Sequence, residues 1–212
     1  MLSITCSGFG GQGVLTAGLL LANVSMEAGK KLTWVPSYGS EMRGGTASCH
    51  LRIGDSEILN PFYSRMDALI AMNEGAVDKF VDHIAEGGVL IVNTSMVAER
   101  EFRKDIRVVR VAATELSQQL KNPRGANIIM LGAAIEATGL FPAEEFADGI
   151  DTFFQRKGKN NPLNRECFMQ GVQAARNSWG RFHHGSEKTF GPQDGRHRRC
   201  QREGRFWRRY LP

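Results

Sequence analysis

The stretch GFGGQG, residues 8–13, follows directly on the apolar run LSITCS of residues 2–7. Gly8, Gly10 and Gly13 have the spacing G-x-G-x-x-G of a phosphate-binding turn between a strand and a helix. In such a turn Gly8 provides the bend, Gly10 allows the backbone to approach a ligand, and Gly13 lets the helix pack tightly on the strand. A chain that begins in this way is expected to fold around a parallel sheet.

In the rest of the chain, short continuous apolar runs typical of strands alternate with segments whose apolar residues have helical spacing, as in an α/β protein. We predict a Rossmann-like, mainly parallel sheet flanked by helices, with a small antiparallel pair of 46–54 and 56–60 and a helical C-terminal part. The opening strand–helix–strand unit indicates a parallel crossover. The further predicted strands are 31–35, 67–72, 87–93 and 106–111, and the predicted helices are 14–29, 74–84, 113–120, 126–139, 142–158 and 161–176.

Basic residues are concentrated at the end of the chain. Residues 1–175 contain 17 Lys and Arg and 19 Asp and Glu, whereas residues 176–212 contain 10 and 3. We predict one α/β domain of residues 1–176, followed by an atypical basic tail of residues 177–212 without helical or strand periodicity. Such a tail suits a loosely ordered extension, an end translated out of frame, or a basic arm for nucleic acid. The slightly acidic body disfavours nucleic acid as a partner.

Several functional classes are disfavoured by what the sequence lacks. No apolar stretch reaches the roughly 18–20 residues that span a bilayer, and no signal peptide is recognisable, so we expect a cytoplasmic protein without membrane contact. The four cysteines are too far apart in sequence for a metal or redox motif, and Cys6 is interpreted as a small buried hydrophobe. We predict no metal site. We also assign no catalytic residue, because His50 is expected to face solvent without a nucleophile beside it.

The glycine turn alone does not indicate NAD. A dinucleotide site needs an acidic residue at the end of the second strand to bind the ribose, and Val35, Pro36 and Ser37 stand there instead. A stand-alone Rossmann-type nucleotide-binding oxidoreductase remains the alternative function. The alternative that the turn serves only to pack the helix on the strand, without binding a ligand, also remains open.

A second motif, PSYGSEMRGG of residues 36–45, narrows the choice. With GFGGQG, VPSYGSEMRGGTASCHLRI, DALIAMN, GGVLIVN and NIIMLGAAI in this order and spacing, the chain resembles the gamma subunit of 2-oxoacid:ferredoxin oxidoreductases. The resemblance covers about residues 2–175. It is greatest to the 2-oxoglutarate and branched-chain 2-oxoacid types.

The resemblance implies a subunit of an enzyme that oxidatively decarboxylates a 2-oxoacid to an acyl-coenzyme A and passes electrons to ferredoxin. In the family, thiamine diphosphate and magnesium lie between the alpha and beta subunits, and iron–sulfur clusters are held by other subunits or domains. The implied partners are these alpha and beta subunits and a ferredoxin-like delta subunit. The isolated chain is then expected to be inactive and to hold none of these cofactors.

The resemblance and the glycine turn together select the candidate binding residues. Arg43 suits a phosphate or carboxylate because its planar guanidinium binds either group through two hydrogen bonds; alternatively it pairs with Glu41. Asn127 either belongs to the site or caps the helix that follows it. The full candidate set is Gly8, Gly10, Gly11, Gln12, Gly13, Ser37, Tyr38, Glu41, Arg43, Gly44, Gly45 and Asn127.

Overall fold

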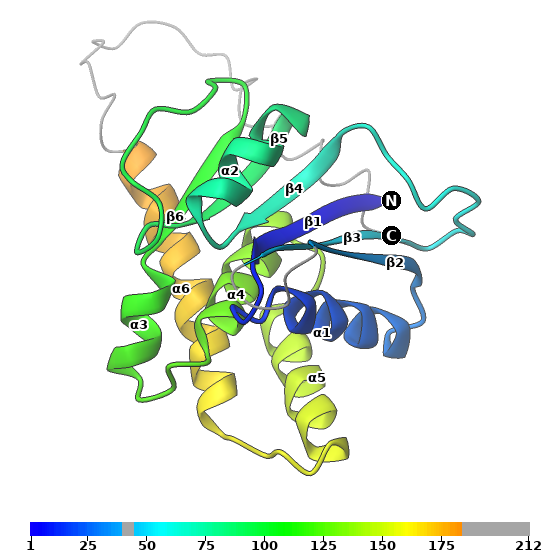
Figure 1. The fold of residues 1–212 in the computed structure, drawn as a ribbon. Coiled ribbons are helices and arrows are strands. Elements are labelled where there is room, and N and C mark those ends of the chain that lie inside the picture. The colour runs from blue at the N-terminus through cyan, green and yellow to red at the C-terminus, as the bar shows by residue number, and fades with distance from the viewer. Residues whose placement is uncertain (40–44, 184–212) are drawn as a thin grey trace, which may run out of the picture.

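The computed structural model describes residues 1–39 and 45–183. Within these residues six strands form one mixed sheet in the order β2-β3-β1-β4-β5-β6 (Figure 1). The strands β1, β4, β5 and β6 run parallel, whereas β3 is antiparallel to both of its neighbours. The strands are β1 (Leu2–Phe9), β2 (Lys31–Tyr38), β3 (Thr46–Gly54), β4 (Met66–Ala71), β5 (Ile84–Asn93) and β6 (Arg107–Val111).

Helices cover the two faces of the sheet unequally. The helix α2 (Glu74–Phe80) packs on one face over β4 and β5, and the other α-helices pack on the opposite face (Figure 1). The predicted α/β fold with a mainly parallel sheet and a helical C-terminal part is confirmed. The helices are α1 (Val14–Glu27), α2 (Glu74–Phe80), the 3-10 turn η1 (Val81–His83), α3 (Ala113–Gln119), α4 (Ala126–Thr138), α5 (Ala143–Arg156) and α6 (Leu163–His183).

The strands alternate between two hydrophobic cores because successive side chains point to opposite faces. In β4, Ile70 contributes to the larger core beneath α1, α4, α5 and α6, and Leu69 contributes to the smaller core beneath α2. In β1 and β3 only the face towards the larger core is apolar. This pattern explains why β4 is a continuous apolar run in sequence, whereas β1 alternates Ile4 and Cys6 with Thr5 and Ser7.

The predicted antiparallel pair was placed wrongly. Residues 56–60 form no strand, and β3 instead pairs with β1 on one side and with β2 on the other. The first crossover therefore runs from β1 through α1 to β2 and leaves room for β3 between the two strands. Side-chain alternation alone did not reveal this, because it shows that a segment is a strand and not which strand lies beside it.

Several segment boundaries also differ from the prediction, among them the start of β5 at Ile84 and not at residue 87. The strand β2 continues to Tyr38, so the first residues of the second motif are extended and not loop. The helix α6 continues to His183, and the predicted division at residues 176/177 falls inside it. The separate character of the segment beyond therefore stays a prediction. Among the described residues no helix has the length and apolarity needed to cross a membrane.

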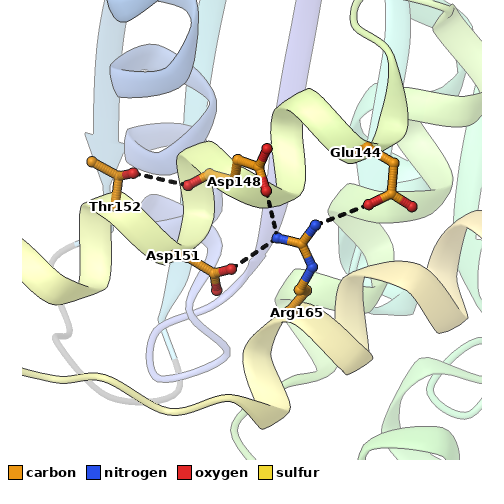
Figure 2. Close-up of polar contacts among 5 residues, drawn as sticks. All are labelled: Glu144, Asp148, Asp151, Thr152 and Arg165. Atoms are coloured by element: carbon orange, nitrogen blue, oxygen red, sulfur yellow. Dashed lines mark hydrogen bonds and ion pairs between the residues drawn. The ribbon is translucent and has the colours of Figure 1, made fainter.

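Arginines connect the outer helices. Figure 2 shows Arg165 of α6 between three carboxylates of α5, at 2.9 Å from Glu144, 2.7 Å from Asp148 and 2.9 Å from Asp151. In the same way Arg176 of α6 pairs with Glu136 of α4, and Arg156 of α5 pairs with Glu27 of α1. These pairs are partly exposed, so each adds at most about 1 kcal/mol. The apolar core beneath them contributes most of the stability of this layer.

Candidate functional site

The sheet has its topological switch point between β1 and β4. These parallel strands are neighbours, yet α1 after β1 and α2 after β4 pack on opposite faces of the sheet. In open α/β sheets ligands bind in the crevice outside the carboxyl ends of two such strands. The glycine loop, residues 8–13, lies at this place.

The glycine loop needs glycine for two different reasons. Gly11 and Gly13 have φ of 100° and 74°, which L side chains adopt only with strain. Gly8 is instead an extended residue of β1, where an added Cβ would lie 2.7 Å from Met72 Cβ and 2.9 Å from Val14 Cγ2. Contrary to the prediction, Gly8 allows close packing, and the turn itself is made by Gly11 and Gly13.

Side-chain amides hold the loop in shape. Gln12 Oε1 accepts a hydrogen bond of 2.7 Å from Phe9 N and one of 3.2 Å from Asn73 Nδ2. Gln12 Nε2 and Asn93 Nδ2 both donate to the carbonyl of Met72. Gln12 therefore positions the loop through inward contacts. Sequence reasoning missed Asn73 and Asn93, although each directly follows a buried run, in DALIAMN and GGVLIVN.

Asn127 joins the N-termini of α1 and α4. Its Nδ2 donates a hydrogen bond of 2.9 Å to the carbonyl of Gly13, the N-cap residue of α1. The alternative that Asn127 caps α4 is wrong, because Gly125 is the N-cap of α4 and that end has no side-chain cap. The side chain of Asn127 is only 5% exposed, and its Oδ1 has no hydrogen-bond partner among the described residues.

This free oxygen has a chemical consequence. Since the amide nitrogen of Asn127 is committed to a carbonyl, the oxygen must be the group left over, and it can only accept. A buried acceptor without a partner costs about 1–3 kcal/mol. A ligand hydroxyl or N–H group would remove this cost.

The helix α1 offers the complementary chemistry. Its N-cap Gly13 provides no side-chain cap, and its first turn contains no acidic residue. The first N–H groups of a helix have no partner within the helix, and the helix dipole favours an anion there. The carboxyl edge of the sheet thus combines donors for a phosphate with one acceptor for a hydroxyl.

The described ends of the second motif, residues 36–39 and 45, lie beside the glycine loop. Gly10 N donates a hydrogen bond of 2.9 Å to the carbonyl of Gly45, and Gly39 N closes the base of the second loop through a bond of 2.8 Å to Thr46 O. In the sheet, Gly8, Ala47 and Tyr38 stand in one cross-strand row. The two motifs, about 25 residues apart in sequence, are therefore parts of one surface.

The remaining candidates divide into two groups. Ser37 and Tyr38 are exposed at the end of β2, and Tyr38 is 67% exposed, so both can reach a ligand or a partner chain. The candidates Glu41, Arg43 and Gly44 lie outside the described residues.

A polar cluster lies on the other face of the sheet. His50 was expected to face solvent, but it is half-buried, with its ring edge-on to Tyr63 and to Phe80. Its Nδ1 lies 3.0 Å from Thr5 Oγ1, and Thr5 Oγ1 lies 2.9 Å from Tyr63 Oη. Prediction from the sequence failed here because the covering rings come from distant segments.

These polar groups form one hydrogen-bonded network. Tyr63 Oη donates to the carbonyl of Ile4 and also lies 3.4 Å from His50 Nδ1, and Thr5 Oγ1 bridges the two rings. Burial, together with the charge of Lys79, lowers the pKa of His50 below its usual value. His50 is therefore a neutral structural group. Among residues 1–39 and 45–183, no three His, Cys, Asp or Glu side chains form a group that could hold a metal ion.

Comparison with known proteins places the chain among oxidoreductase subunits. Residues 3–174 match the family model described as pyruvate ferredoxin/flavodoxin oxidoreductase. The ketoisovalerate oxidoreductase subunit VorA of Methanothermobacter marburgensis is 35% identical over 175 residues, which make up 82% of this chain and 36% of VorA. This chain thus spans about a third of the length of that relative.

Shorter relatives are matched over nearly their whole length. The 2-oxoglutarate synthase subunit KorC of Methanocaldococcus jannaschii is 34% identical over 82% of this chain and 93% of KorC. The solved gamma subunit of the keto/oxoacid ferredoxin oxidoreductase from Geobacter sulfurreducens is 28% identical, with a TM-score of 0.69 over 84% of this chain and 99% of that chain. The described fold is therefore that of the gamma subunit.

Proposed function

Because the chain belongs to the pyruvate ferredoxin/flavodoxin oxidoreductase family, we propose that it is the gamma-type subunit of a multi-subunit 2-oxoacid:ferredoxin oxidoreductase. The names of its relatives describe them as subunits, among them VorA of a ketoisovalerate enzyme and KorC of a 2-oxoglutarate enzyme. The substrate class is accordingly a 2-oxoacid, either 2-oxoglutarate or a branched-chain acid. The enzyme works in the cytoplasm, with alpha and beta subunits, a ferredoxin-like delta subunit and ferredoxin as partners.

The observation on which the site rests is the hydrogen bond from Gly10 N to the carbonyl of Gly45, which brings the end of the second motif to the glycine loop. The surface at this place binds a phosphate-bearing ligand, and in this family coenzyme A fits its donors. Phe9 N, Gly10 N and Gln12 N already donate within the loops, so the N–H groups at the start of α1 would hold the phosphate oxygens. Arg43 would pair with a further phosphate, and Asn127 Oδ1 would accept from a hydroxyl group. Coenzyme A supplies the thiol that accepts the acyl group.

The chemistry at the 2-oxoacid belongs to other subunits in this proposal. Thiamine diphosphate, magnesium and the iron–sulfur clusters are expected on the alpha, beta and delta chains. The described cysteines of this chain are buried in the core, which does not fit the ligand set of an iron–sulfur cluster. The residues of this chain bind and orient, and we assign them no proton transfer.

Purification from the native source tests the proposal. The tagged chain should be recovered with partner chains that contain thiamine diphosphate, and the complex should reduce ferredoxin or a viologen dye with a 2-oxoacid and coenzyme A. Comparing 2-oxoglutarate with 3-methyl-2-oxobutanoate identifies the substrate. Recovery of the chain alone, with NAD-dependent activity, would instead support the stand-alone nucleotide-binding oxidoreductase.

The variant Arg43→Ala tests the ligand site within that complex. Loss of a charge-assisted contact should raise the KM for coenzyme A by about 10- to 100-fold and leave assembly intact. Arg156→Ala is the matched control, because Arg156 pairs with Glu27 on the surface between α5 and α1. An unchanged KM together with a lower melting temperature would show that Arg43 pairs with Glu41 and stabilises the loop instead.

A further inference from the structure

Two buried thiols meet on the inner face of the sheet. Cys6 of β1 and Cys49 of β3 are directly opposite residues of the antiparallel pair, and they are 1% and 0% exposed. The Cα atoms of directly opposite residues in such a pair lie about 4.5 or 5.5 Å apart. Both separations are within the range that a disulfide spans. The backbone thus already has the separation that a bond between the two sulfur atoms requires.

The sulfur of Cys49 fills the space that Gly18 leaves open because this residue has no side chain. A Cβ added at Gly18 of α1 would lie 2.3 Å from Cys49 Sγ and 3.0 Å from Trp34 Nε1, so the sulfur and the indole occupy the volume beside this glycine. Trp34 Nε1 is a buried donor with no partner of normal hydrogen-bond geometry among the described residues. The Trp34 N–H group therefore lies close to the sulfur, as does the carbonyl of Val14, to which Cys49 Sγ donates at 3.7 Å.

The two thiols differ in acidity. The hydrogen bond from Cys6, aided by Trp34, lowers the pKa of Cys49, whereas the hydrogen bond to Cys49 and burial raise the pKa of Cys6. Cys49 is thus the more acidic of the two, and it loses its proton from a thiol that donates to the carbonyl of Val14 at 3.7 Å. This is the division between an attacking and a resolving cysteine in redox-active pairs.

We propose that Cys6 and Cys49 form an oxidative modification site, in which a hydroperoxide converts the two thiols to an intramolecular disulfide between β1 and β3. The Cys49 thiolate attacks the peroxide O–O bond, which gives a sulfenic acid and, with hydrogen peroxide, water after protonation. The Cys6 sulfur then attacks the sulfenic sulfur, the S–O bond breaks, and a second water leaves. Two thiols and one hydrogen peroxide give one disulfide and two water molecules.

The position of this pair connects it to the loops. The strand β1 leads into the glycine loop, and β3 leads away from the second loop, so the disulfide would tie together the strands that support both. Cys167 of α6 is also fully buried, but its sulfur accepts from Asn122 Nδ2 at 3.5 Å, and no other described cysteine lies opposite it. It is the matched control for burial without a neighbouring thiol.

Peptide mapping of the full-length chain tests the proposal. Native protein is treated with hydrogen peroxide, blocked with N-ethylmaleimide and digested with trypsin without reduction. The linked peptides 1–30 and 44–52 should appear and separate again with dithiothreitol, and the count of free thiols should fall from four to two. Because the two sulfurs are held together, this link should form at least about tenfold faster than any link to Cys167 or Cys200.

Variants separate the two steps. Cys6→Ala should abolish the link and leave Cys49 as a sulfenic acid that dimedone traps, whereas Cys167→Ala should leave the rate of linking unchanged. Peptide mapping of the native chain tests the proposal even where a variant fails to fold. Absence of the linked peptides, or their formation only after unfolding in guanidinium chloride, would overturn the proposal.

Discussion

Gly13 is constrained twice, by its φ of 74° and by Asn127 Nδ2, which would lie 2.5 Å from an added Cβ. We predict that Gly13→Ala lowers the free energy of unfolding by more than the roughly 1–2 kcal/mol that a left-handed conformation costs an L residue. In an Asn127→Ala background the clash is gone, because every close neighbour of that Cβ belongs to Asn127. Only the backbone cost should then remain.

A double-mutant cycle in urea measures this coupling. Asn127→Ala alone should cost less than about 1 kcal/mol, since the Gly13 carbonyl keeps its hydrogen bond from Ala17 N and the unpartnered Asn127 Oδ1 is removed as well. The cost of Gly13→Ala should be smaller by at least about 1 kcal/mol in the Asn127→Ala protein. Strictly additive costs would show that Asn127 does not support the turn.

His50 makes stability depend on pH. Its pKa in the folded chain is lowered by burial and by Lys79, so protonation favours the unfolded chain. Its contribution to stability is present above the unfolded pKa of about 6.5 and is lost as the pH falls through the folded pKa. We predict that the free energy of unfolding drops between pH 7.5 and pH 5.5, and that His50→Gln reduces this drop.

Urea unfolding at both pH values checks this prediction. His83→Gln is the control, because it removes a histidine that is exposed in η1 instead of half-buried. An equal drop in wild-type and His50→Gln protein would assign the pH dependence to other groups. The carboxyl group of Asp67 changes the stability in the opposite direction. Burial raises its pKa, so its protonated form favours the folded chain, and this contribution to stability is lost as the pH rises.

The helices α4 and α6 cross at two glycines. A Cβ at Gly132 would lie 2.0 Å from Phe168 O, and a Cβ at Gly171 would lie 1.9 Å from Ile129 O. These neighbours are backbone atoms, so the helices themselves would have to separate. We predict that Gly132→Ala or Gly171→Ala destabilises the chain by about 3 kcal/mol or more, despite the better helix propensity of alanine.

The control for this prediction is Gly75→Ala in α2. The nearest atom to a Cβ there is Asn73 Oδ1 at 3.8 Å, an ordinary contact. This variant should keep the stability of the wild type or raise it by about 0.4–1 kcal/mol. Thermal unfolding of the three variants decides, and wild-type stability of Gly132→Ala would contradict the close crossing.

For the molecule as a whole, we predict that the chain folds without residues 184–212. The family match ends at residue 174, and the last described helix ends at His183. The segment beyond is rich in Arg and Gly and has no apolar period, so it adds little to a core. A chain that ends at His183 should unfold within about 0.5 kcal/mol of the full chain in urea. A loss of several kcal/mol would show that the tail completes the core.

The order of elements could be predicted from the sequence because the signals are local. Alternation of period two and helical spacing are properties of a few neighbouring residues, and they located β1, α1, β4, β6 and α4 to within a few residues. The glycine loop was found for the same reason, since its spacing is written in six consecutive residues. The need for glycine at residues 11 and 13 then follows from backbone geometry.

Pairing was decided only in the tertiary structure. The insertion of β3 between β1 and β2, the contact of Asn127 with Gly13 and the covering of His50 by Tyr63 and Phe80 join residues that are distant in sequence. Cys6 and Cys49 are 43 positions apart, and each alone is typical of a small buried side chain. Which residues become neighbours depends on how whole strands and helices bury their apolar faces together. The local spacing of apolar residues does not determine this arrangement.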